Sequence, residues 1–203
     1  VAGDYYDVIP IDPHRTALAV GDVSGKGAGA ALIMANLQAS LRALCGVGIE
    51  LVDLVYRINE IIFRNTDSEQ YITFFVGIFD SRDRTLTYVN AGHNYPLLVR
   101  KNNGIEYLRD GGTILGALPE ITFSQAATQL EPGDVLLLYT DGVNETMDDS
   151  GIEYGETRLE ACLVSRRTLK APDIVQYLKA DVATYRRGNP ITDDLTFLLA
   201  RIL

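Results

Sequence analysis

The chain contains no tryptophan, and its 203 residues include only two cysteines and two histidines. Cys45 and Cys162 both lie in stretches with helical spacing of apolar residues, so we expect two reduced thiols in the core. A disulfide or a cysteine-based metal site is disfavoured. Because zinc and copper prefer thiolate and imidazole ligands, a metal site in this chain would have to rely on oxygen ligands.

Basic residues are scarce relative to acidic ones. There are 18 Lys and Arg residues against 27 Asp and Glu residues, which gives a formal net charge of −9. Surfaces that bind nucleic acids or anionic membranes need clustered Lys and Arg, so this balance argues against both kinds of partner. Excess acid often serves solubility, and it would also suit cation binding if the carboxylates converge.

Long apolar runs and targeting signals are missing as well. No run reaches the roughly 18 residues of a membrane-spanning helix, and no basic segment followed by an apolar one marks a signal peptide. We therefore expect a cytoplasmic protein that makes no membrane contact through this domain. The sequence opens on Val1 without Met and has no Pro- or Ser-rich linker. We interpret residues 1–203 as a single domain excised from a longer multidomain regulator.

The periodicity of apolar residues predicts a mixture of helices and hairpins. Strands gathered into hairpins favour an α+β fold with antiparallel sheets and helices packed on their faces. Residues 141–156 contain six acidic residues and no basic one, so we expect an exposed flap there. This flap would either select substrate or be an ordinary solvated loop. The expected helices span residues 30–46, 50–65, 156–164 and 173–188, and the expected strands or hairpins span 17–20, 71–93, 96–108, 135–142 and 192–203.

Four aspartates lie where an apolar or aromatic segment meets a turn: Asp4, Asp22, Asp141 and Asp193. Any one of them alone is most simply a turn or capping residue. Four in the same setting suggest a cluster, because side chains just beyond strand ends are held by a rigid frame yet reach solvent. Carboxylates without nearby His or Cys favour Mg²⁺ or Mn²⁺. Two such ions about 3.5–4 Å apart would suit the hydrolysis of a phosphomonoester.

The stretch "GDVSGKG" at residues 21–27 could also be interpreted as a nucleotide-binding loop or as the turn that carries a nucleophilic serine. A nucleotide-binding P-loop needs four residues between its first two glycines and then Lys followed by Ser or Thr. The spacing from Gly21 to Gly25 is one residue too short, and Gly27 stands where the hydroxyl residue should be. A serine-nucleophile elbow would need a glycine at position 22, where the chain has Asp22. Both alternatives are therefore disfavoured.

Five motifs occur in order along the chain: "GDYYD", "GDVSGKGAGAAL", "NAGHNYP", "TDGVNE" and "DDLTF". Together they resemble the metal-dependent PPM (type 2C) protein serine/threonine phosphatases, in the bacterial branch of SpoIIE and RsbU. The resemblance runs from Gly3 to about Leu199. It implies an α+β fold arranged as a four-layer α-β-β-α sandwich with two antiparallel sheets.

The resemblance also implies a site that holds two Mn²⁺ or Mg²⁺ ions. Its metal ligands would be Asp4, Asp22, the backbone carbonyl of Val23, Asp141 and Asp193. Asp22 would bridge both ions, Asp4 and Val23 would serve one of them, and Asp141 and Asp193 would serve the other. Asp22 and Asp141 would be catalytic through a water that bridges the ions and attacks phosphoserine or phosphothreonine directly.

Some positions near these motifs are left open or depart from the family. Asp194 is exchangeable with Asp193 as the direct ligand. Ser24 stands where the eukaryotic branch has a proton-donating His, and His93 in "NAGHN" is expected to play a structural, hydrogen-bonded role. We expect neither cysteine nor Ser24 to act as a nucleophile.

The resemblance further implies a signalling role in stress response and sigma-factor regulation. The substrate would be a phosphorylated anti-anti-sigma-like protein, and an upstream sensor or receiver domain would control the enzyme. The first long helix could serve a homodimer. The alternative hypotheses are a catalytically weak PPM-fold module that senses or docks a partner protein, and nucleotide binding through the glycine turn.

Overall fold

The computed structural model describes residues 3–66 and 70–203. The chain divides into two compact units, of which the first comprises Val1–His93 and Arg109–Gln129 and the second Asn94–Leu108 and Leu130–Leu203. Neither unit is therefore a continuous segment of the chain. In the part of the chain that the structure describes, no helix is both long enough and apolar enough to cross a membrane.

The first unit is built on a sheet with the strand order β1-β2-β3-β4-β7, and β8 also pairs with β4. The pairs β1–β2, β2–β3, β3–β4 and β4–β8 are antiparallel, as expected, whereas β4 and β7 run parallel. This sheet is therefore mixed. Its strands are β1 (Asp4–Pro10), β2 (Arg15–Val23), β3 (Ile72–Asp80), β4 (Thr85–Ala91), β7 (Gly111–Gly112) and β8 (Ala126–Gln129).

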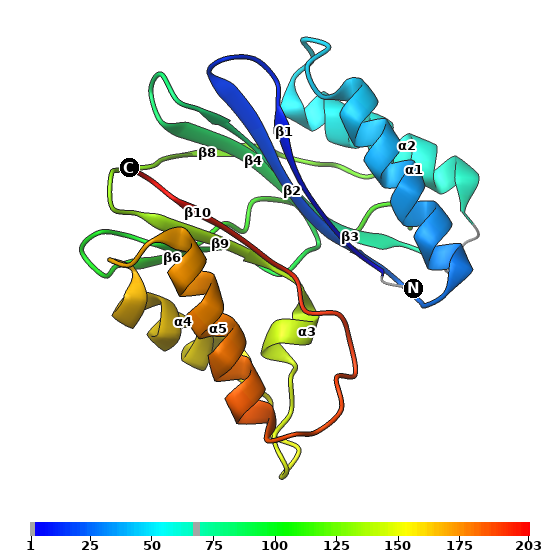
Figure 1. Cartoon of the computed structure of the whole chain (residues 1–203). Coiled ribbons are helices and arrows are strands. Elements are labelled where there is room, and N and C mark those ends of the chain that lie inside the picture. Colours follow the sequence, from blue (N-terminus) through cyan, green and yellow to red (C-terminus); the bar gives the residue numbers. More distant parts are fainter. Residues whose placement is uncertain (1–2, 67–69) are drawn as a thin grey trace. The chain divides into compact units, whose positions relative to one another are not determined.

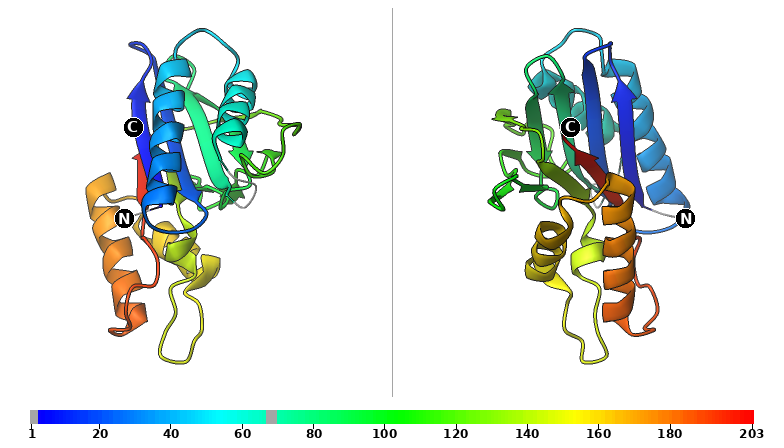
Figure 2. Two further views of the ribbon diagram at one scale, coloured as in Figure 1. Left: turned by 90° about the vertical axis from the view of Figure 1, so that its right-hand side faces the viewer. Right: turned by 60° about the vertical axis from the view of Figure 1, so that its left-hand side comes forward.

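Helices α1 (Ala28–Leu44) and α2 (Leu51–Asn65) cover one face of this sheet (Figures 1 and 2). Each helix buries residues three or four apart, which is the spacing of one helical face. This agrees with the helices that the sequence predicts. The buried helical residues include Ala30, Ile33, Leu37 and Leu41 of α1 and Leu51, Leu54, Val55, Ile58 and Ile62 of α2, and they share a core with Tyr5, Ala19, Val23, Ile72, Phe74 and Val76 of the sheet.

An ion pair between the half-exposed Arg42 and the buried Asp7 joins α1 to strand β1. Nε of Arg42 donates to Oδ2 of Asp7 at 2.7 Å, and Nη2 donates to Oδ1 at 2.8 Å. The hydroxyl of Tyr5 also donates to Asp7, at 2.8 Å. Burial alone would raise the pKa of Asp7, but the hydrogen bonds from Arg42, Tyr5 and the Val8 amide outweigh it, so the pKa is lowered. The pair thus holds a charged carboxylate in the layer between helix and sheet.

Replacing Arg42 by Met should destabilise the protein most at neutral pH. The variant leaves the charge of Asp7 buried without its cation, and we expect Tm to fall by roughly 5 °C at pH 7. A carboxyl with a lowered folded-state pKa stabilises the fold above its unfolded pKa of about 4, and this contribution is lost as the pH falls through the folded-state value. The difference in Tm should therefore shrink towards pH 3.

Thermal unfolding at both pH values measures this effect. Arg64→Met is the matched control, because Arg64 makes its ion pair with Glu60 on the exposed side of α2 and exposed pairs contribute little. An equal Tm loss in the two variants, or one independent of pH, would show that the Asp7 pair has no special role.

The second unit has an antiparallel sheet with the strand order β10-β9-β5-β6. In Figure 1, α4 and α5 lie together against one face of this sheet. They bury Leu159, Leu163, Ile174 and Leu178 in a core that includes Leu137 and Tyr139 of β9. The elements are β5 (Leu97–Val99), β6 (Ile105–Tyr107), β9 (Val135–Tyr139), α3 (Asp141–Asn144), α4 (Gly155–Arg166), α5 (Ala171–Arg186) and β10 (Phe197–Arg201).

The polar stretch 141–156 differs from the exposed flap that its composition predicts. It begins with the short helix α3, and Val143 and Tyr154 are fully buried. The Tyr154 hydroxyl hydrogen bonds to Asp181 of α5 at 2.5 Å. The loop between Met147 and Glu153, which pair as an isolated bridge, is mostly exposed, as are Glu145 and Glu156. The buried side chains of Val143 and Tyr154 thus hold in place a segment that its acidic composition predicts to be solvated.

Candidate functional site

Asp4 and Asp22 lie next to each other on the first sheet. They are Cα partners in the β1–β2 register, near the start of β1 and the end of β2. Their neighbours Tyr5 and Val23 point into the core under the helices. Because successive residues of a strand point to opposite faces, both aspartates are on the face away from α1 and α2.

Gly3 leaves a space beside two oxygen atoms. A Cβ atom at this position would lie 3.1 Å from Oδ1 of Asp22 and 3.1 Å from the carbonyl oxygen of Val23. The two oxygens therefore border the same small space, which the missing side chain keeps open. A carboxylate and a backbone carbonyl are the oxygen donors that Mg²⁺ and Mn²⁺ accept. The residues of this unit fit a hard divalent cation.

Thr73 continues the row of Asp4 and Asp22 across the sheet. It is the Cα partner of Asp22 on β3, so the two side chains share a face. Its hydroxyl lies 2.9 Å from Nδ1 of His93, which is itself buried. The backbone amide of His93 donates to Oδ1 of Asn90 at 2.8 Å. His93 thus has the hydrogen-bonded environment expected of a structural histidine, and its partner Thr73 is paired with Asp22.

Replacing Thr73 by Val is expected to destabilise the protein by about 1–2 kcal/mol, because a buried imidazole nitrogen loses the hydroxyl it is bonded to. Thr73→Ser keeps that hydroxyl and should retain most of the stability. Urea denaturation of the two variants and the wild type measures the difference. If the Val variant were as stable as the Ser variant, the hydrogen bond to His93 would contribute nothing.

In the second unit, Asp141 and Asp193 belong to adjoining segments. Asp141 is the first residue of α3, and only Thr140 separates it from β9. A Cβ atom on Gly142 would lie 2.1 Å from the carbonyl oxygen of Asp194 and 3.4 Å from Cβ of Asp193. Only glycine permits this approach. The start of α3 and the segment that carries Asp193 and Asp194 are therefore in direct contact.

Glu145, at the end of α3, lies close to other carboxylates of this region. Burial raises the pKa of Glu145, and the negative charges of Asp141, Glu153 and Asp193 raise it further. The carboxylates are thus close enough to repel one another, a repulsion that a bound cation would relieve. Within residues 3–66 and 70–203, no three Asp, Glu, His or Cys side chains form a group that could hold a metal ion. The aspartates lie in pairs, one in each unit.

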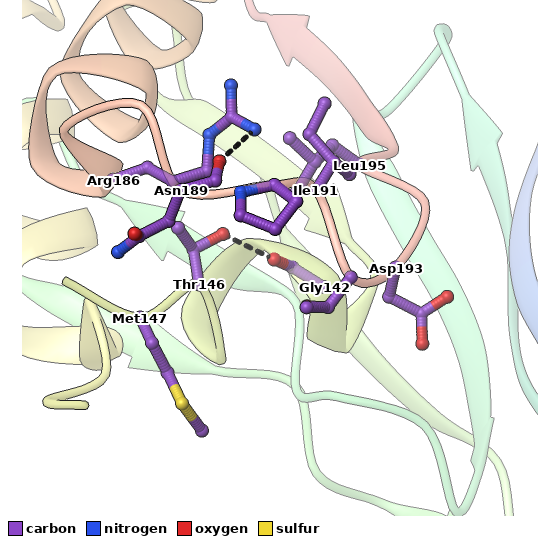
Figure 3. Close-up of a pocket in the computed structure, with 10 residues that line it drawn as sticks. Gly142, Thr146, Met147, Arg186, Asn189, Ile191, Asp193 and Leu195 are labelled. Carbon is purple, nitrogen blue, oxygen red and sulfur yellow. Dashed lines mark hydrogen bonds between the residues drawn. The ribbon is translucent and has the colours of Figure 1, made fainter. Parts of the chain in front are cut away.

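A pocket of about 210 Å³ opens beside Asp193. Figure 3 shows that the Asp193 carboxylate points away from Arg186 and Met147 on the opposite side of the pocket. Ile191 and Leu195 also contribute to its wall. The full lining is Gly142, Thr146, Met147, Arg186, Asn189, Pro190, Ile191, Thr192, Asp193 and Leu195.

The structure thus brings together Asp4, Asp22 and Val23 in the first unit and Asp141 with Asp193 in the second. Thr73 and Glu145 are neighbours of these pairs that the sequence analysis did not select as site residues. A signal for Thr73 would have required the β2–β3 register. Glu145 ends the motif "TDGVNE", but the sequence analysis gave it no role of its own.

Comparison with known proteins identifies the family of the chain. The family described as Stage II sporulation protein E (SpoIIE) matches residues 12–203. Protein IcfG of Synechocystis sp. is 27% identical over 98% of this chain and 35% of its own length. The phosphoserine phosphatase RsbU of Bacillus subtilis is 30% identical over 74% of this chain and 45% of its own length. The chain therefore spans less than half the length of these relatives.

Solved structures show the same fold. The crystal structure of the RsbU and RsbW domains of Rv1364c from Mycobacterium tuberculosis is 27% identical, covers 98% of this chain and 55% of its own, and has a TM-score of 0.80. The SiaA-PP2C domain of Pseudomonas aeruginosa is 20% identical with a TM-score of 0.86, covering all of this chain and 82% of its own. RsbX, solved in complex with magnesium, is 18% identical with a TM-score of 0.73, covering 98% and 86%.

The α+β class is thus confirmed as a PP2C fold, in which helices flank two sheets. The family match covers nearly the whole chain, and RsbU, a phosphoserine phosphatase, is similar over most of it. The chain therefore belongs to the SpoIIE family, and it is related to the phosphoserine phosphatase RsbU.

Proposed function

We propose that this domain hydrolyses phosphoserine or phosphothreonine on a regulatory protein, with two Mn²⁺ or Mg²⁺ ions as cofactors. The observation that carries the proposal is the space beside Gly3, bordered by Oδ1 of Asp22 and the carbonyl of Val23. Two oxygens of the types that a divalent cation binds border this space. The magnesium in the structure of RsbX supports the choice of metal.

In this proposal the two aspartate pairs act together. Asp22 would contact both ions, Asp4 and the Val23 carbonyl would bind one, and Asp141 and Asp193, or Asp194 in its place, would bind the other. When bound, the ions would lower the pKa of a water molecule and neutralise charge on the phosphoryl group. Asp22 is fixed by paired strands on both sides, and Asp141 by the start of α3, so both catalytic carboxylates would be held in place for this reaction.

No protein side chain is proposed as the nucleophile. Burial raises the pKa of the Cys45 thiol and of the Cys162 thiol. Thiols with a raised pKa are mostly protonated at neutral pH and react slowly. The hydroxyl of Ser24 accepts a hydrogen bond from the Tyr71 amide at 2.9 Å, which gives it a structural role. The raised thiol pKa values and the hydrogen bond of Ser24 support direct attack by water without a covalent intermediate.

We further propose that residues 1–203 form one domain of a longer cytoplasmic regulator. Its substrate would be a phosphorylated anti-anti-sigma-like protein, and an upstream sensor or receiver domain would control it. The union of RsbU and RsbW domains in one Mycobacterium tuberculosis protein supports a regulatory protein partner. Leu32, which is 73% exposed on α1, is a candidate contact for a homodimer.

Manganese titration of p-nitrophenyl phosphate hydrolysis tests the proposed activity. We expect hydrolysis that is absent in EDTA, rises with Mn²⁺ and saturates. A phosphoserine peptide should be hydrolysed under the same conditions. If the domain bound a phosphoprotein without hydrolysing either compound at any metal concentration, it would be a docking module instead of an enzyme.

A further inference from the structure

The pocket beside Asp193 has an apolar character that the proposed chemistry does not require. Met147 and Ile191 are 50% and 59% exposed, and both line it together with Pro190 and Leu195. Large apolar side chains at this level of exposure, gathered around one cavity, are typical of binding sites. Methionine in particular adapts its shape to different apolar groups.

Two polar side chains of the pocket wall, Thr146 and Arg186, make hydrogen bonds within the protein. The Thr146 hydroxyl donates to the carbonyl of Gly142 at 2.7 Å. Nη1 of Arg186 donates to the carbonyl of Asn189 at 2.6 Å, which holds the end of α5 to the segment that follows it (Figure 3). These bonds fix opposite walls of the pocket. The pocket surface that a ligand would contact is mainly apolar.

The position of the pocket indicates what would occupy it. Its lining includes Gly142, which follows Asp141, and Asp193 itself. Both aspartates are metal ligands in the proposed function, so the phosphorylated residue would bind next to the pocket mouth. Because an extended chain advances at most about 3.3–3.6 Å per residue, the residues within a few positions of the phosphoserine would be close enough to reach this pocket.

We propose that this pocket binds an apolar side chain of the phosphoprotein, within a few residues of the phosphoserine. This inference rests on the proposed function and adds a substrate preference to it. Met147 and Ile191 are the specificity-determining residues, since they form the exposed apolar rim. The domain would thus favour phosphoserines flanked by Leu, Ile, Met or Phe over those in polar segments.

A set of synthetic phosphopeptides tests this preference. Glycine peptides with a central phosphoserine carry a single Leu, placed at each position in turn, and each is hydrolysed by the wild type in saturating Mn²⁺. We expect Leu at one or more positions to raise kcat/KM about tenfold over the peptide without Leu. In Met147→Ser and Ile191→Ser that ratio should fall to within twofold of one. Because the readout is a ratio between two peptides, a general loss of activity cancels.

Ile152→Ser is the matched control. Ile152 is 55% exposed in the same loop as Met147 but does not line the pocket, so the variant should keep both its activity and its leucine preference. Hydrolysis with no effect of Leu at any position, or a preference that survives in both pocket variants, would overturn the inference and leave the proposed function standing. If neither the peptides nor p-nitrophenyl phosphate were hydrolysed, the proposed function would fail and this inference with it.

Discussion

Asp22→Asn is expected to lower kcat/KM for p-nitrophenyl phosphate by at least about 1,000-fold, which corresponds to about 4 kcal/mol of transition-state stabilisation. The substitution keeps the size of the side chain but removes the charge that would hold two cations. Calorimetric titration should show Mn²⁺ binding weakened by at least about 100-fold. Asp22 is only partly buried and is the last but one residue of β2, so the variant should still fold.

Asp12→Asn is the control for this experiment. Asp12 lies in the turn between β1 and β2, and its carboxylate accepts hydrogen bonds from the amides of His14 and Arg15 at 2.8 Å. The same chemical change at the turn of this hairpin should leave hydrolysis and Mn²⁺ affinity unaltered. If Asp22→Asn kept manganese-dependent turnover near the wild-type rate, Asp22 would not be the bridging ligand.

Gly142→Ala is expected to lower the free energy of unfolding by roughly 3 kcal/mol and to abolish most of the activity. The new Cβ would lie 2.1 Å from a backbone oxygen of Asp194, so α3 or the segment with Asp193 has to shift. Overpacking of this kind costs about 1–3 kcal/mol, and more where backbone must move. The same shift would separate Asp141 from Asp193, and metal-dependent hydrolysis should fall with stability.

Gly29→Ala provides the comparison, because Gly29 lies in α1 and its nearest contact would be a side-chain nitrogen of Gln70 at 3.4 Å. It should be neutral or slightly stabilising, since alanine has the better helix propensity. Urea denaturation and the p-nitrophenyl phosphate assay measure both variants. A Gly142→Ala protein as stable and as active as Gly29→Ala would show that the contact with Asp194 is not required.

The helices of this fold were the most predictable elements. The apolar stripes of α1 and α2 extend over four or more turns, so the expected limits lie within two residues of the observed ones. β8 was not predicted, because Ala126–Gln129 has small and polar residues with alternate positions exposed. The pairing of β7 with β4 depends on Gly111, whose backbone approaches Asn90 so closely that a Cβ would lie 1.9 Å from its carbonyl oxygen. Glycines have no strand preference, and such a tertiary contact leaves no local pattern.

The candidate site was predictable in its residue types and only partly in its geometry. Aspartates at the ends of apolar segments and five ordered motifs were sufficient to select Asp4, Asp22, Asp141 and Asp193. The pairing of Asp4 with Asp22 depends on strand register, which the hydrophobic pattern does not reveal at the polar end of a hairpin. The position of Thr73 beside Asp22 also depends on strand register, so it could not be predicted either. The apolar pocket escaped prediction because Met147 and Ile191 are far apart in sequence, each in a polar segment.

The central claim is that Asp22 lies between two divalent ions, and crystals grown with Mn²⁺ test it most directly. Anomalous diffraction at the manganese edge should show two peaks about 3.5–4 Å apart, with Asp22 contacting both. Asp4 and the Val23 carbonyl should bind one ion, and Asp141 with Asp193 or Asp194 the other. A structure in which manganese binds elsewhere, or in which Asp22 contacts no ion, would contradict the account.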